Sequence, residues 1–128
     1  MRRLLALFLL VACAGPKPGQ PPEIVFGRHE CARCGMIVSE ERYAAGFVGD
    51  DGEPVAFDDL GELLALLDAE PGLRARAWAR DLNGRGWLRL SEADVVQVPA
   101  LATPMGTGWA AFATREQADA FVSARARR

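Results

Sequence analysis

The fold is decided by residues 53–67, which read EPVAFDDLGELLALL. The first five residues have the character of a short strand. The leucines that follow recur with helical spacing and predict one apolar helix face, made of Leu60, Leu63, Leu64 and Leu67. Asp59 is suited to cap this helix, with Glu62 three residues later as its capping-box partner. The stretch therefore predicts a strand that leads directly into a helix.

A first hairpin is predicted immediately upstream. Residues 42–48 place Tyr43, Ala45 and Phe47 on one face, as a strand does. Residues 49–52 read Gly-Asp-Asp-Gly, which is typical of a turn, and the strand over 53–57 then returns beside the first one.

A second hairpin is predicted after Pro71-Gly72, which ends the helix. Strands over 74–81 and 86–90 flank Asn83-Gly84, a strong hairpin signal. Further strands are expected over 94–98 and 108–113.

A second strand-to-helix unit near the C-terminus echoes the first. Thr114, with Gln117 three residues later, is predicted to cap a closing helix whose buried face is formed by Ala118, Phe121 and Val122. We therefore predict an α+β fold of two related half-domains, each made of antiparallel strands plus one helix.

The N-terminus has the pattern of an export signal. The basic residues Arg2 and Arg3 are followed by an apolar run over residues 4–12 that is too short to cross a bilayer as a helix. Residues 1–12 are therefore predicted to be a signal peptide. The run ends in Leu-Val-Ala-Cys at residues 10–13, which resembles the bacterial lipoprotein box and implies that Cys13 carries a lipid. An ordinary signal peptide with Cys13 nearby by chance is the alternative.

The segment after Cys13 is rich in proline and glycine. Residues 13–26 are therefore predicted to be an extended tether, and residues 27–128 a single domain. Half of the chain is apolar, and its net charge is only −2 with no basic stripe. This composition argues against nucleic-acid binding.

The reactive chemistry is concentrated in Cys31-Ala-Arg-Cys-Gly-Met36 and in Thr103-Pro-Met-Gly106. Thiolate and thioether sulfur are soft ligands that select Cu(I) over hard cations. Cysteines three apart close so small a loop that a disulfide between them would add little stability. The candidate ligands are thus Cys31, Cys34, Met36 and Met105, with His29 as a weaker one.

Other interpretations of these residues stay open. A CxxC pair can be a redox pair, although Gly35 is a poor residue for the helix that usually follows one. Structural zinc requires four Cys or His ligands, and Cys31, Cys34 and His29 supply only three. Met36 and Met105 can be core residues, which is the usual role of methionine.

The chain resembles the NosL family of copper-binding lipoproteins that serve nitrous oxide reductase. The resemblance covers about residues 30–122. It rests on the CxxCGM and TPMG motifs together with Arg42-Tyr43-Ala44-Ala45, Phe57-Asp58-Asp59, Asp81, Trp87, Ala111-Phe112, Ala118 and Phe121. The chain departs from the family pattern at residues 88–90 and at Val95-Val96.

The resemblance implies a fold similar to that of organomercurial lyase and a binding protein, not an enzyme. It also implies lipid anchoring on the periplasmic side of a bacterial membrane and delivery of Cu(I) for the copper centres of nitrous oxide reductase, by contact with that enzyme or its copper-assembly transporter machinery. Thiolate from Cys31 or Cys34, with Met36 or Met105, is expected to hold the ion. A periplasmic copper scavenger or sensor with another client, and a thiol-disulfide oxidoreductase using Cys31 and Cys34, are the alternatives.

Overall fold

The computed structural model describes residues 19–84 and 86–128. The predicted signal peptide, the lipid site Cys13 and the first part of the tether lie outside these residues. In chain order the elements are the 3-10 helix η1 (Glu41–Tyr43), β1 (Ala45–Val48), β2 (Pro54–Phe57), α1 (Leu60–Ala69), the 3-10 helix η2 (Pro71–Arg76), β3 (Trp78–Arg80), β4 (Trp87–Arg89), β5 (Asp94–Gln97), β6 (Trp109–Phe112) and α2 (Arg115–Ala126).

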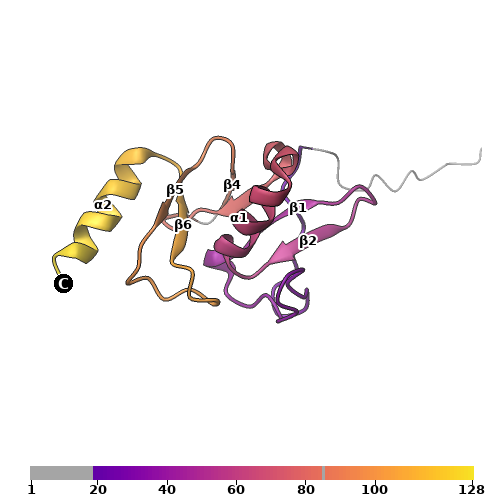
Figure 1. Ribbon diagram of the computed structural model, residues 1–128, viewed down its shortest axis with the longest axis horizontal. Coiled ribbons are helices and arrows are strands. Elements are labelled where there is room, and N and C mark those ends of the chain that lie inside the picture. The colour runs from indigo at the N-terminus through magenta and orange to yellow at the C-terminus, as the bar shows by residue number, and fades with distance from the viewer. Residues whose placement is uncertain (1–18, 85) are drawn as a thin grey trace, which may run out of the picture.

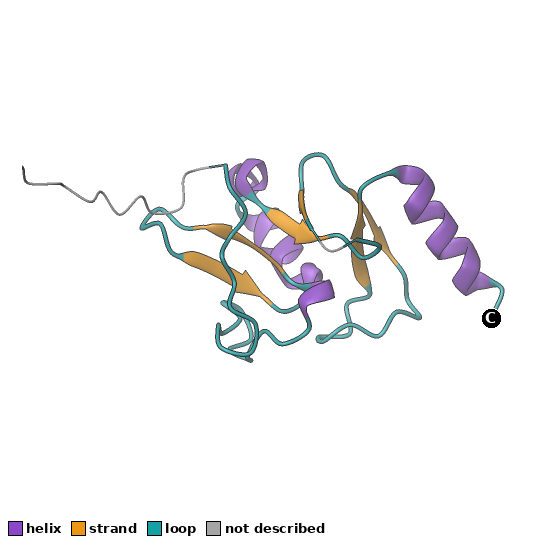
Figure 2. Ribbon diagram, turned by 180° about the vertical axis from the view of Figure 1, so that it is seen from behind, coloured by secondary structure: helices purple, strands orange, loops and turns teal. Residues whose placement is uncertain are grey.

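Two antiparallel sheets organise the molecule. The larger sheet has the strand order β2-β1-β3-β4, and α1 packs against it. The smaller sheet pairs β5 with β6, and α2 covers it at the C-terminal end of the molecule (Figures 1 and 2). A bridge between Asp81 and Ala111 links the two sheets. The predicted α+β class with two strand-and-helix halves is confirmed.

The first hairpin forms as predicted, but its first strand is shorter. Residues 41–43 form η1, and β1 begins only at Ala45, opposite Phe57. All four residues of β1 are buried, so neither face is exposed to solvent. An ideal Cβ at Gly46 would lie 2.4 Å from the Val55 carbonyl oxygen and 3.3 Å from Pro22. This close packing requires glycine in the strand.

Residues 19–26 pack against the domain, although the sequence assigns them to the tether. Pro22 is fully buried, and Ile24 and Phe26 pack on the main core. The Gly19 carbonyl oxygen accepts a hydrogen bond of 2.6 Å from Arg89. The packed part of the chain thus includes residues before the predicted boundary at 27.

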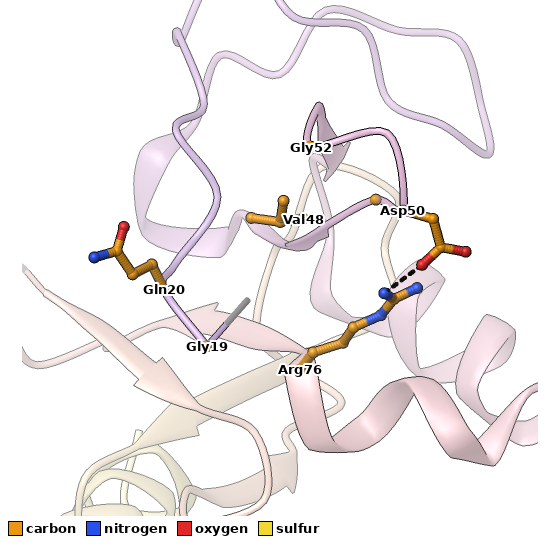
Figure 3. Close-up of a pocket in the computed structure, with 7 residues that line it drawn as sticks. Gly19, Gln20, Val48, Asp50, Gly52 and Arg76 are labelled. Carbon is orange, nitrogen blue, oxygen red and sulfur yellow. Dashed lines mark hydrogen bonds and ion pairs between the residues drawn. The ribbon is translucent and has the colours of Figure 1, made fainter. Parts of the chain in front are cut away.

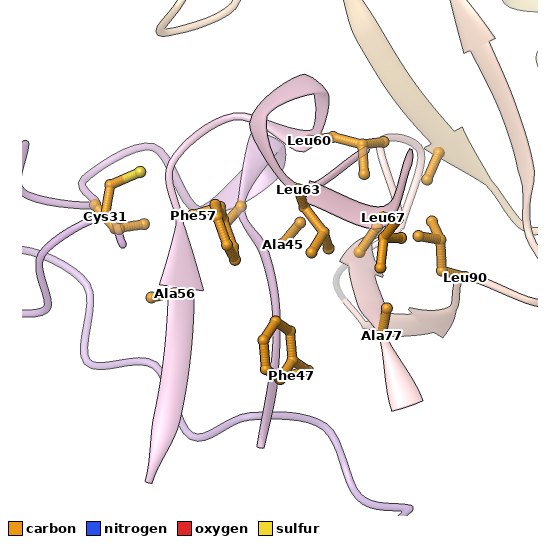
Figure 4. Packing of buried hydrophobic residues seen from close by; sticks show 14 residues of the cluster. Cys31, Ala45, Phe47, Ala56, Phe57, Leu60, Leu63, Leu67, Ala77 and Leu90 are labelled. Carbon is orange, nitrogen blue, oxygen red and sulfur yellow. The ribbon is translucent and has the colours of Figure 1, made fainter. Parts of the chain in front are cut away.

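Helix α1 carries the centre of the main core. Leu60, Leu63 and Leu67 are buried in the main core together with Phe57 (Figure 4). Leu64 is partly buried and packs against this core. Asp59 is the N-cap, as predicted, because its Oδ1 accepts a hydrogen bond of 2.9 Å from the Gly61 amide. The predicted capping-box role of Glu62 is wrong, since its carboxylate accepts a hydrogen bond from Cys31 instead.

The second hairpin also forms, with β3 paired to β4. The strand predicted from residue 74 begins only at Trp78. Residues 71–76 form η2 because Pro71 occupies a first helical position, where proline is favoured.

Helix α2 begins as predicted, since the Thr114 hydroxyl accepts a hydrogen bond of 3.3 Å from the Gln117 amide. Ala118 is buried, and the Phe121 ring lies 5.2 Å from that of Phe112. Val122 is 39% exposed and therefore does not belong to the predicted buried face. Within residues 19–84 and 86–128, no helix combines the length and apolar character needed to cross a membrane.

Candidate metal centre

The CxxCGM motif forms a tight loop that reverses the chain. The Cys31 amide donates to the Met36 carbonyl at 2.7 Å, and the Gly35 amide donates to the Cys31 carbonyl at 2.9 Å. Gly35 has a φ of +74°, in the left-handed region that favours glycine. The glycine after the second cysteine therefore closes a loop and does not open a helix.

This loop is attached to the end of β2. Cys31 forms a parallel bridge with Ala56, and the Ala32 amide donates to the Ala56 carbonyl at 2.8 Å. Figure 4 shows Cys31 beside Phe57, where the chain leaves β2 for α1. The pairing thus brings both cysteines to the start of α1.

Four candidate ligands meet at this point. One ligand atom from each of Cys31, Cys34, Asp58 and Glu62 lies within 4.8 Å of the others. The Cys31 thiol donates to Glu62 Oε2 at 2.9 Å, and the Cys34 thiol donates to Asp58 Oδ1 at 3.6 Å. Both cysteines are free thiols, and Cys34 is the most exposed of the four residues. Two soft and two hard ligands can therefore converge on one cation.

In the absence of a cation, the surroundings of the cluster favour the protonated forms of Cys31 and Glu62. Burial raises the pKa of the Cys31 thiol to about 12, and the hydrogen bond to Glu62 adds to this shift. Burial also raises the pKa of Glu62, and the neighbouring Asp58 carboxyl acts in the same direction. A bound cation would supply the positive charge that these groups lack and would displace protons from them.

The two candidate thioethers lie on exposed loop positions outside this cluster. Met36 is 54% exposed and follows Cys34 by two residues. Met105 is 41% exposed and lies in a turn closed by a 2.9 Å hydrogen bond from the Gly106 amide to the Thr103 carbonyl. Neither methionine is a core residue.

His29 is engaged in a local contact. Its Nδ1 accepts a hydrogen bond of 2.9 Å from the Val25 amide. The ligand cluster found among the described residues does not include it. The structure thus brings Cys31 and Cys34 together and leaves His29, Met36 and Met105 outside the four-residue cluster.

The turn that carries Met105 is attached to the start of α1 through Asp59. This fully buried carboxylate accepts hydrogen bonds from the Thr103 hydroxyl at 2.6 Å, from the Met105 amide at 2.9 Å and from the Thr107 hydroxyl. Burial alone would raise the pKa of Asp59, but these hydrogen bonds together hold it below its usual value. Met105 is therefore fixed to the residue that follows Asp58.

Sequence reasoning missed the two carboxylates of the cluster. The sequence predicts Glu62 as a capping-box partner, and Asp58 enters only through the motif on which the family resemblance rests. Asp58 precedes the N-cap of α1 and Glu62 lies in its first turn, so the spacing of a helix face does not relate them, and the fold brings both to the cysteine loop. With these carboxylates the ligand count reaches four, so the shortage of zinc ligands inferred from the sequence no longer holds.

A separate hollow on the surface lacks comparable chemistry. Gly19, Gln20, Val48, Gly49, Asp50, Gly52 and Arg76 line it (Figure 3). Its charged groups, Arg76 and Asp50, satisfy each other in an ion pair of 2.7 Å. The Cys31–Glu62 cluster remains the candidate functional site.

Comparison of the chain with protein-family models, with curated proteins and with solved structures yields no match.

Proposed function

We propose that this protein is a Cu(I) carrier. The observation that carries the proposal is the convergence of the Cys31 and Cys34 thiols at one point. Met36 follows in the cysteine loop, and the Met105 turn is held by Asp59, the neighbour of Asp58. Thiolates of the two cysteines would hold the ion, and Met36 or Met105 would complete a site of low coordination number. Thioether and thiolate ligands both favour Cu(I).

The exposure of the ligands suits transfer better than storage. Cys31 is buried, whereas Cys34 is half-buried and both methionines are exposed. Ligands of a partner protein can approach an ion from the exposed side and replace the thioethers first, because a neutral thioether binds the ion less strongly than a thiolate does.

The client of the carrier is proposed from the resemblance to the NosL family. On this basis the protein is exported, is anchored by a lipid on Cys13 at the periplasmic side of a bacterial membrane, and delivers Cu(I) to nitrous oxide reductase or its copper-assembly transporter machinery. It acts as a binding protein, not as an enzyme. A copper scavenger or sensor would use the same site with another client.

The raised pKa of Cys31 argues against the thiol-disulfide oxidoreductase alternative. A reactive cysteine requires a lowered pKa, because the thiolate is the nucleophile. In this protein burial raises the pKa of Cys31 to about 12. Cys31 is therefore poorly suited to attack a disulfide.

The two carboxylates favour a second candidate, a carrier or structural site for Zn²⁺. Zinc accepts cysteine sulfur and Asp or Glu oxygen in tetrahedral sites. Cys31, Cys34, Asp58 and Glu62 together supply four such ligands within 4.8 Å.

Metal competition with the reduced full-length chain tests the proposal and separates the two candidates. We expect about one Cu(I) per chain, held more tightly than Zn²⁺. The Cys31→Ser, Cys34→Ser double variant should lose this binding, whereas Cys13→Ser, a matched control outside the cluster, should retain it. Tighter binding of Zn²⁺ would favour the second candidate. Unchanged Cu(I) loading in the double variant would refute the proposed site.

A further inference from the structure

Asp58 and Asp59 are adjacent in the chain but contact different parts of the molecule. Asp59 has an extended backbone conformation, with φ −137° and ψ 127°. Successive side chains of an extended segment point to opposite sides. Asp58 accordingly meets Cys34, and Asp59 meets the turn that carries Met105. One dipeptide thus connects the metal cluster to the second half of the molecule.

Asp59 binds this turn at three points. Its carboxylate accepts from the hydroxyls of Thr103 and Thr107 and from the amide of Met105, and its own side chain is fully buried. Hydrogen bonds to a buried charged group are stronger than those between neutral groups. The backbone position of Met105 is therefore set by Asp59.

The contact between α1 and this turn also requires glycine at position 61. An ideal Cβ at Gly61 would lie 2.4 to 2.6 Å from three side-chain atoms of Thr107, which is closer than real Cβ atoms approach. Glycine within a helix is less favourable than alanine. The close approach of Thr107 is a physical reason for glycine at this position, and it is independent of the hydrogen bonds to Asp59.

We infer that Asp59 is a positioning residue that holds the Met105 turn against the start of α1, so that the Met105 thioether can serve as a ligand for Cu(I) bound at Cys31 and Cys34. This inference rests on the proposed function. It adds that the two halves of the fold contribute jointly to the copper site, with cysteines from the first half and a thioether from the second.

The inference predicts different effects on the two metals. A thioether favours Cu(I), whereas the carboxylates of Asp58 and Glu62 favour Zn²⁺. Displacing the Met105 turn should therefore weaken Cu(I) binding and leave Zn²⁺ binding unchanged. General destabilisation of the fold would weaken the binding of both metals.

The test combines Gly61→Ala with Met105→Leu in the full-length chain. Gly72→Ala is the matched control, because a Cβ at Gly72 meets nothing within 4 Å. Met105→Leu alone should lower Cu(I) affinity by about tenfold, and Gly61→Ala alone by a similar factor. The double variant should lose no more than either single one, and Gly72→Ala should behave as the parent chain.

Thr103→Val provides a second route if Gly61→Ala does not fold. It nearly preserves side-chain shape and removes the hydroxyl that donates to Asp59 and accepts a hydrogen bond of 3.1 Å from the Gly108 amide. Amide hydrogen exchange in the metal-free chain then gives a readout independent of copper. The Met105 amide should be protected in the parent chain, since it donates to Asp59, and should exchange faster in both variants.

The outcomes separate this inference from the proposed function. If Cu(I) binding depends on the cysteines but the effects of Gly61→Ala and Met105→Leu simply add, the positioning role of Asp59 is refuted and the carrier stands. Equal losses of Cu(I) and Zn²⁺ affinity in Gly61→Ala would also refute it. If the cysteine variants retain Cu(I), both the carrier and the positioning role fail.

Discussion

The Sγ atom of Cys31 lies 2.9 Å from Oε2 of Glu62, although the two residues are 31 positions apart in the chain. The contact exists because Cys31 is bridged to Ala56 at the end of β2, and β2 leads directly into α1. Glu62 consequently faces the cysteine loop from the first turn of the helix. Glu62, whose position three residues after Asp59 predicts a capping-box partner, is instead part of the candidate metal centre.

Substitution of Glu62 by glutamine should separate the two candidate metals. The pKa of Glu62 is raised by burial, so its ionised form destabilises the folded chain at neutral pH. Glu62→Gln should therefore leave the free energy of unfolding unchanged or raise it. Zn²⁺ affinity should fall by about 10- to 100-fold, while Cu(I) affinity changes little.

Competition titrations and chemical denaturation measure these two effects. Glu70→Gln, at an exposed acid outside the cluster, is the control. A loss of Cu(I) affinity as large as that of Zn²⁺ would show that the carboxylate is also a copper ligand.

Metal loading should release protons. With a pKa of about 12, Cys31 is a protonated thiol at neutral pH and must lose its proton to bind a cation as thiolate. We expect at least one proton released per Cu(I), and an apparent affinity that falls as the pH is lowered. Calorimetry in buffers of different ionisation enthalpy measures the proton count. Release of no proton would mean that the thiols do not bind the ion.

The fold was largely predictable because its signals are local. The hairpin turns, the leucine spacing in residues 60–67 and the caps Asp59 and Thr114 each depend on a few neighbouring residues. Element boundaries were less predictable. The start of β1 was misplaced because Glu41–Tyr43 form η1. The alternating pattern also left open a face of β1 that Pro22 covers, and nothing local to β1 reveals that contact.

Only two of the four residues in the candidate site were predictable from the sequence, because the other two depend on a contact between segments that are distant in the chain. The CxxC spacing indicates that Cys31 and Cys34 are candidate metal ligands, and Gly35 after the second cysteine predicts a loop. Asp58 and Glu62 become ligands only through the pairing of the cysteine loop with Ala56. A single sequence contains no signal for that pairing, which joins segments about 25 residues apart.

Oxidation should abolish copper binding without unfolding the chain. The two thiols lie within 4.8 Å of each other, and a disulfide offers no thiolate to a metal. The closed loop is so short that the free energy of unfolding should change little. Cu(I) titration before and after oxidation, with denaturation in parallel, tests this expectation. Equal loading of both forms would mean that the methionines alone bind the ion.

The predicted lipid anchor depends on Cys13. Cys13→Ser should abolish labelling by a lipid precursor and release the chain from the membrane fraction, or leave it unprocessed. Cys34→Ser provides the comparison, because it changes a cysteine of the metal cluster and should leave labelling intact. Membrane retention of Cys13→Ser equal to that of the parent chain would contradict the lipoprotein assignment.

Met105 should contribute to copper handling and not to stability. Its side chain is 41% exposed, and its attachment to Asp59 uses the backbone amide, which an alanine retains. Met105→Ala should therefore lower the free energy of unfolding by less than about 1 kcal/mol. Met36→Ala should behave in the same way, since Met36 is 54% exposed.

Leu63→Ala, in the fully buried core, should instead cost about 2–5 kcal/mol. Chemical denaturation alongside Cu(I) competition distinguishes these cases. A strongly destabilised Met105→Ala variant with normal copper affinity would make Met105 a packing residue and leave the metal site to the residues around Cys31 and Cys34.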